Sequence, residues 1–213
     1  MLKRKKEKNK SQLYIIGSLL LLIGISILSF KFYIYYKDVK LEKNILNEFY
    51  EEQEVIKEDS EINNEESQID IEKDFIDTTD TVDYIAVLKI PKINLEKGLV
   101  AKDSIDNNVE KNIQILNESS MPDKENGNVI LAGHNGNGST SYFRNIHKLS
   151  LDDEVSIYYN GYEYKYKVMN SYKVNKTGKV DIIRNNDKST LTLITCYGKD
   201  KQLIVICELI ERI

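Results

Sequence analysis

An uncharged apolar run near the N-terminus most strongly limits how this chain can fold. Residues 13–30 contain no charged side chain and are dominated by Leu and Ile, and four Phe or Tyr residues follow between positions 32 and 36. A helix needs about 20 apolar residues to cross the hydrocarbon core of a membrane, and aromatic side chains are enriched where it leaves that core. We therefore expect residues 13–36 to form a single transmembrane anchor.

The charges beside this run predict its orientation. Residues 1–12 form a basic tip, with six Lys or Arg against one Glu in the first ten positions. Because basic flanks stay on the cytoplasmic side, we expect a cytoplasmic N-terminus in the cell membrane and an extracytoplasmic remainder. The basic tip then meets membrane lipid and not nucleic acid. The alternative is a cleaved signal peptide, but the apolar run is long for one and no Ala-x-Ala site follows it.

The next segment is strongly acidic. Residues 37–80 hold 16 acidic and 5 basic residues and no Gly or Pro. Leu41, Ile45, Phe49 and Ile56 follow a partial helical spacing, whereas the part from residue 58 onward is rich in Glu, Asp, Asn and Ser. We expect a short helix after the membrane and then an acidic, mostly disordered stalk.

From residue 81 the sequence changes to short runs in which apolar and polar residues alternate, which is typical of strands. We predict strands at residues 84–90, 93–100, 129–134, 154–159, 162–174, 191–196 and 203–209. Helical spacing predicts a helix over 104–118, with Ser104 as its cap, and a short one over 142–149. Asn160-Gly161 is a hairpin signal. Residues 81–213 are therefore expected to form one mainly β domain, a closed barrel or a sandwich.

Two strand ends hold residues suited to nucleophilic catalysis. Cys196 ends one strand and is followed by a loop sequence, and His134 ends another and is followed by Asn and Gly residues. A thiol with a neighbouring imidazole is the pair that cysteine acyl-transfer enzymes use. Cys207 lies within a strand, so we expect a buried hydrophobic role, although a disulfide with Cys196 is the alternative. We expect His147, on the predicted helix, to be structural or solvated.

These segments resemble those of the sortase family. Residues 127–136 resemble the segment that holds the sortase His, and residues 191–196 (Leu-Thr-Leu-Ile-Thr-Cys) resemble the Thr-Leu-x-Thr-Cys segment. The similarity covers about residues 81–213 and implies an eight-stranded β-barrel with two or three short helices. It also implies a membrane-anchored transpeptidase of mainly Gram-positive bacteria, which cleaves a Leu-Pro-x-Thr-Gly-like sorting signal of surface proteins and joins it to a cell-wall amine, such as a peptidoglycan precursor.

The resemblance assigns roles to individual residues. Cys196 would be the nucleophile that forms the acyl-thioester, and His134 would give and take the proton. The family also has an Arg at the start of the last strand, where residues 199–205 here read Lys-Asp-Lys-Gln-Leu-Ile-Val. We take Lys201 as its replacement and Gln202 as the alternative, because Arg184 and Arg212 are misplaced in the sequence. No cofactor and no metal ion are expected.

The sequence also narrows the subtype and leaves alternatives open. It has no Trp, and its two Pro are Pro91 and Pro122, so the Asp-Pro-Trp or Asp-Pro-Phe lid of pilin-polymerising sortases is not found. Together with the short segment between Val174 and Thr190, this favours a class A- or D-like enzyme. The alternatives are a weak or inactive sortase-like module that only binds peptides, and another cysteine transpeptidase of the cell wall.

Overall fold

The computed structural model describes residues 2–62 and 82–213 of the chain. Residues 2–62 form one helix, α1 (Leu2–Ile62), and the remainder forms a β-sheet domain. Contacts divide the chain into two compact units, Met1–Ile45 and Leu46–Ile213, which are described separately. The second half of the predicted stalk lies largely in residues 63–81, outside the described residues.

α1 has the length and composition of a membrane-spanning helix. Its stretch Ile16–Lys57 contains a sufficiently apolar window, a criterion that signal sequences also meet. The helix predicted after the membrane is not a separate element, because α1 runs without interruption to Ile62. The absence of Gly and Pro between residues 37 and 62 explains this continuity, since Glu, Lys and Leu favour helix.

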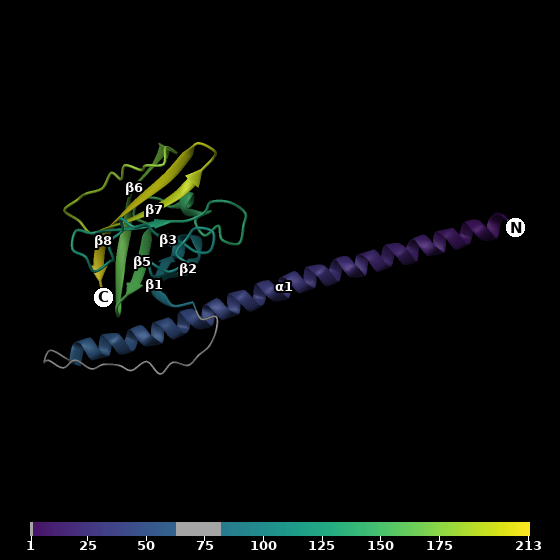
Figure 1. The fold of residues 1–213 in the computed structure, drawn as a ribbon, viewed down its shortest axis with the longest axis horizontal. Helices are drawn as coiled ribbons and strands as arrows, with labels where there is room; N and C mark the ends of the chain where they lie inside the picture. Colours follow the sequence, from purple (N-terminus) through teal and green to yellow (C-terminus); the bar gives the residue numbers. More distant parts are fainter. Residues whose placement is uncertain (1, 63–81) are drawn as a thin grey trace. The chain divides into compact units, whose positions relative to one another are not determined.

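Eight strands form one sheet. Figure 1 shows its long strands β6, β7 and β8 beside one another. The strands are β1 (Tyr84–Ile90), β2 (Leu95–Val100), β3 (Gln114–Ile115), β4 (Asn128–Ala132), β5 (Glu154–Tyr159), β6 (Tyr162–Asn175), β7 (Thr190–Tyr197) and β8 (Lys201–Arg212). Their order is β2-β1-β5-β6-β8-β7-β4-β3. The Asn112 side chain donates to the carbonyl of Gly98 at 3.0 Å, which links the chain just before β3 to β2, the other edge strand. The sheet is therefore a nearly closed eight-stranded barrel, as predicted.

The strand pairs are antiparallel except for β4 and β7. The predicted hairpin turn joins β5 to β6, and Asn160 and Gly161 have φ angles of 50° and 78°. Such positive angles are the reason why Asn-Gly suits this turn. The parallel pair β4–β7 matters most for function, because both predicted catalytic residues follow the same end of it.

The two faces of the central strands belong to different clusters. Leu191 and Leu193 of β7 face the main core together with Leu203, Val205 and Cys207 of β8. Ile194 lies on the other face and packs with Ile130, Ile204 and Ile206, and Val180 and Ile182 from the segment between β6 and β7 pack against this second cluster. Because side chains alternate along a strand, Cys196 shares this second face with Ile194.

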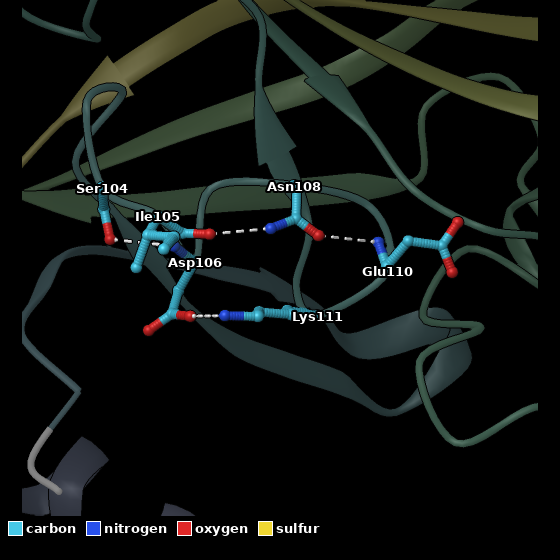
Figure 2. A network of polar contacts seen from close by, with 6 residues as sticks. All are labelled: Ser104, Ile105, Asp106, Asn108, Glu110 and Lys111. Atoms are coloured by element: carbon cyan, nitrogen blue, oxygen red, sulfur yellow. Dashed lines mark hydrogen bonds and ion pairs between the residues drawn. The ribbon is translucent and has the colours of Figure 1, made fainter.

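The predicted helix over residues 104–118 is wrong. This segment consists of turns followed by β3, and Ile105, expected on a buried helical face, is 83% exposed. Figure 2 shows the reason: the Asp106 amide donates to the Ser104 hydroxyl at 3.2 Å, and the Glu110 amide donates to the Asn108 side chain at 3.1 Å. Ser and Asn side chains thus replace the backbone carbonyls that a helix needs as acceptors.

Two other segments differ from the prediction: one is less helical than expected, and one strand begins later than expected. The segment 142–149 contains turns and only a short 3₁₀ helix, Ile146–Lys148. Pro91–Ile93 is also 3₁₀, so the second predicted strand begins at Leu95. Both are single turns and leave the course of the barrel unchanged.

The last part of α1 packs against the barrel within the second unit. Leu46 and Phe49 are buried with Val87 of β1, and Tyr50, Tyr84 and Tyr158 lie around them. The Tyr50 hydroxyl donates to Glu96 at 2.7 Å. Leu46, Phe49 and Tyr50 thus take part in the packing of this unit, although they precede residue 81, at which the sequence places the domain boundary.

Candidate active site

β4 and β7 bring the segments of His134 and Cys196 side by side. Ala132 pairs with Ile194 in parallel register, so the chain leaves both strands at the same edge. The amide of Gly133 donates to the carbonyl of Ile194 at 3.1 Å, which continues the pairing by one residue. The Thr195 hydroxyl donates to the carbonyl of Gly133 at 2.7 Å. The residues directly before His134 and Cys196 are therefore hydrogen-bonded to each other.

A further hydrogen bond joins the two segments beyond the last strand pair, Ala132 with Ile194. The Asn135 side-chain amide donates to the backbone carbonyl of Cys196 at 2.8 Å. Cys196 is partly buried and not in a disulfide, and the side chain of His134 is 36% exposed. Both predicted catalytic side chains are thus open to a ligand from solvent.

Only glycine fits at position 133, because the ring of Phe143 lies against its backbone. A Cβ atom at this position would lie 2.8 Å from Cγ of the Phe143 ring, which is too close for carbon atoms. The Phe143 amide also donates to the carbonyl of His134 at 3.1 Å. The fully buried Phe143 therefore supports the backbone of His134 from the core side.

Glu110 contacts His134 and was not predicted as a site residue. Its carboxylate oxygen Oε1 lies 3.0 Å from Nε2 of His134. Since a carboxylate only accepts hydrogen bonds, this contact places a proton on Nε2 and orients the ring. The sequence gives no local signal for it, because Glu110 lies 24 residues before His134 in the turns shown in Figure 2.

Lys176 also contacts the site and was not predicted. Its ammonium nitrogen Nζ lies 3.7 Å from Sγ of Cys196. Lys176 follows β6, and its amide donates to the carbonyl of Asp200 at 2.8 Å, so it continues the pairing with the start of β8. A positive charge therefore lies beside the candidate nucleophile.

The structure places the two predicted replacements for the family Arg on different faces. Lys201 pairs with Tyr197, whereas Gln202 pairs with Cys196. Directly paired residues share a face of the sheet, so Gln202 lies on the Cys196 side and Lys201 on the opposite side. The structure thus brings Gln202, and not Lys201, next to Cys196.

The remaining Cys and His have other surroundings. Cys207 is free and fully buried in the main core, and burial raises the pKa of its thiol to about 12. It faces away from Cys196, so the alternative of a disulfide between them is not realised. His147 is exposed, and its Nδ1 donates to the carbonyl of Arg144 at 2.9 Å.

Within residues 2–62 and 82–213 no group of three His, Cys, Asp or Glu is arranged to hold a metal ion.

A family model for the sortase domain matches residues 88–210, which is more than half of the chain. The chain belongs to the sortase family. The match includes β4, β7 and β8 as far as residue 210, and therefore His134, Cys196 and the start of the last strand.

Two curated sortases are similar over part of their length. Sortase D of Bacillus subtilis is 32% identical over 111 residues, which are 52% of this chain and 53% of that protein. Sortase A of Bacillus anthracis is 31% identical over 134 residues, or 62% of each protein. The chain thus spans between half and two thirds of the relatives that it matches.

Solved sortase structures share the fold. A Clostridium perfringens Sortase D5 transpeptidase is 28% identical with a TM-score of 0.58, covering 81% of this chain and 99% of that one. Sortase A from Corynebacterium diphtheriae has a TM-score of 0.54 at 22% identity, covering 62% of each chain, and this similarity concerns the fold alone.

Proposed function

We propose that this sortase-family protein is a cysteine transpeptidase with Cys196 as nucleophile and His134 as proton donor and acceptor. Two hydrogen bonds support this most directly. The Gly133 amide donates to the carbonyl of Ile194, and the Thr195 hydroxyl donates to the carbonyl of Gly133. They hold a thiol and an imidazole at one edge of a rigid parallel strand pair, which is the arrangement that nucleophilic catalysis needs.

The reaction consists of two acyl transfers. The thiolate of Cys196 attacks the scissile carbonyl, and the amine leaves after His134 has protonated it, so that a thioester forms. An incoming amine then attacks the thioester while His134 takes its proton, and the Cys196 sulfur leaves. His134 ends as it began, which closes the cycle. Glu110, in contact with Nε2, keeps the ring oriented through both steps.

The substrates follow from the family. A surface protein with a Leu-Pro-x-Thr-Gly-like signal supplies the acyl group, and a cell-wall amine, such as that of a peptidoglycan precursor, accepts it. The enzyme is then an extracytoplasmic domain on a single-pass anchor, with residues 13–36 of α1 in the cell membrane and the N-terminus in the cytoplasm. The Sortase A and Sortase D relatives support a class A- or D-like assignment.

Incubation of the full-length protein in detergent with a library of Leu-Pro-x-Thr-Gly peptides tests this proposal. We expect mass spectrometry to detect an acyl adduct on Cys196 and, after addition of an amine such as triglycine, the transpeptidation product. Cys196→Ala should abolish both, and Cys207→Ala should retain both. Peptide binding without any adduct would instead support the alternative of a peptide-binding module.

A further inference from the structure

We propose that Lys176 is the catalytic cation of this protein, and that it stabilises the Cys196 thiolate where the family uses an Arg on the last strand. The inference rests on the proposed function for its role in catalysis. The contact itself can be tested through the chemistry of the thiol alone, without any peptide substrate.

The strand register places Lys176 on the Cys196 face of the sheet. Cys196 pairs with Gln202, and Gln202 pairs with Val174 on its other side. These three residues form a row across β7, β8 and β6, with their side chains on one face. Lys176 comes two residues after Val174 and continues the same pairing, so its side chain returns to that face. The distance of 3.7 Å from Nζ to Sγ follows from this register.

The two arginines that the sequence offered are engaged elsewhere. Arg184 donates to Thr190, Asn185, Lys188 and Asn126, which lie near the start of β7, whereas Cys196 lies near its end. Arg212 stacks on the ring of Tyr162, with 4.2 Å from Cζ to the ring centroid.

The lysines on the opposite face are also accounted for. Lys173 lies over the ring of Tyr197, with Nζ 3.8 Å from its centroid, and Lys201 pairs with Tyr197 on the same face. Among the charged and titratable groups near Cys196, His134 and Glu110 lie on the β4 side, and Lys199 and Asp200 lie in the turn between β7 and β8. Among the residues that the structure describes, Lys176 is the cation found within 3.7 Å of the Cys196 sulfur.

Gln202 explains why the charge must come from another strand. It occupies the position directly opposite Cys196 but carries a neutral amide. Its Oε1 is buried and has no hydrogen-bond partner. A neutral amide cannot supply a positive charge, which the ammonium of Lys176 brings to 3.7 Å from the sulfur.

An ammonium at this distance favours the charged thiolate over the neutral thiol. When the thiolate attacks, the negative charge moves from sulfur to the carbonyl oxygen of the substrate. The flexible stem of Lys176 allows the ammonium to follow that charge, although without the planar, two-pronged geometry of an Arg. Lys176 thus acts in both the activation of the nucleophile and the stabilisation of the oxyanion.

Alkylation of Cys196 by iodoacetamide measures the first of these effects. In the full-length protein, Lys176→Gln should slow alkylation at pH 7, because the variant lacks the positive charge that lies 3.7 Å from Sγ and favours the reactive thiolate. The two rates should converge at high pH, where the thiol is ionised in both proteins. Lys176→Arg should keep the parent rate, and Lys173→Gln serves as a matched control with an unchanged rate. Mass spectrometry assigns the adduct to Cys196.

A pH–rate profile of Lys176→Gln that coincides with that of the parent would overturn the proposal, as would a loss found for Lys201→Gln instead. With a reactive sorting peptide, Lys176→Gln should also lower the rate of thioester formation, and Lys176→Arg should rescue it. Slower alkylation in Lys176→Gln without cleavage of any peptide would support the role of Lys176 and refute the proposed substrate. The two proposals can therefore fail independently.

Discussion

The hydrogen bond from Thr195 to Gly133 makes a quantitative prediction for the variant Thr195→Val. Thr195 is only 2% exposed, and its hydroxyl lies 2.7 Å from the buried carbonyl of Gly133. Val has the same shape but no donor, so the carbonyl remains buried without a partner, at a cost of about 1–3 kcal/mol. For a protein of this size each kcal/mol lowers Tm by about 2–4 °C. We therefore expect a fall in Tm of several degrees.

The same substitution should reduce activity more than stability alone explains. Gly133 directly precedes His134, and a shift of about 1 Å in a catalytic group can lower the rate roughly a hundredfold. Thr192→Val is the matched control, because Thr192 is fully buried in the same strand and donates to Asn128 at 2.9 Å, four residues before Cys196. It should lower Tm and leave kcat nearly unchanged.

Thermal unfolding followed by circular dichroism and steady-state cleavage of a fluorogenic sorting peptide give the two quantities. An unaltered Tm in Thr195→Val would show that the hydroxyl contributes nothing to stability. Equal losses of kcat in Thr195→Val and Thr192→Val would show that the effect on His134 is not local. Either result would refute the role assigned to the hydrogen bond between Thr195 and Gly133.

Two further predictions concern stability. A protein starting at residue 82 should still cleave peptide, because β4 and β7 hold His134 and Cys196. It should unfold at a lower temperature than a protein starting at residue 40, since Leu46 and Phe49 cover Val87. Equal Tm values for the two proteins would instead support a domain boundary at residue 81. The second change is Cys207→Ala, which should lower stability at pH 7 by about 1 kcal/mol and leave catalysis intact. Burial raises the pKa of the Cys207 thiol to about 12, so the unfolded state loses this proton first and the parent loses stability as pH rises from about 9 toward 12. The difference in the free energy of unfolding between the parent and Cys207→Ala, measured by chemical denaturation, should therefore narrow over that pH range.

Local patterns in the sequence predicted every strand except β3, because alternation is a property of neighbouring positions. They placed strand ends less well, since β4 ends at Ala132, two residues before His134, and β7 continues past Cys196 to Tyr197. They could not predict Lys176 or Glu110 as partners of the site, since these residues reach it only through the pairing of distant strands and turns. The ambiguity between Lys201 and Gln202 has the same origin, because a shift of one residue in register exchanges the two faces of a strand. The false helix over 104–118 arose because apolar spacing was given more weight than the Ser and Asn side chains that bond the local backbone.

The parallel pairing of β4 and β7 also determines when this site can form. Cys196 lies 62 positions after His134, the segment between them includes β5 and β6, and β7 lies between β4 and β8 in the finished sheet. Non-local pairings of this kind are slow steps in folding, because the chain loses much entropy before the contacts are gained. The thiol and the imidazole therefore meet only when the late strands join the earlier ones. During refolding, the recovery of Cys196 chemistry should report the closure of the barrel and not the formation of its first hairpins.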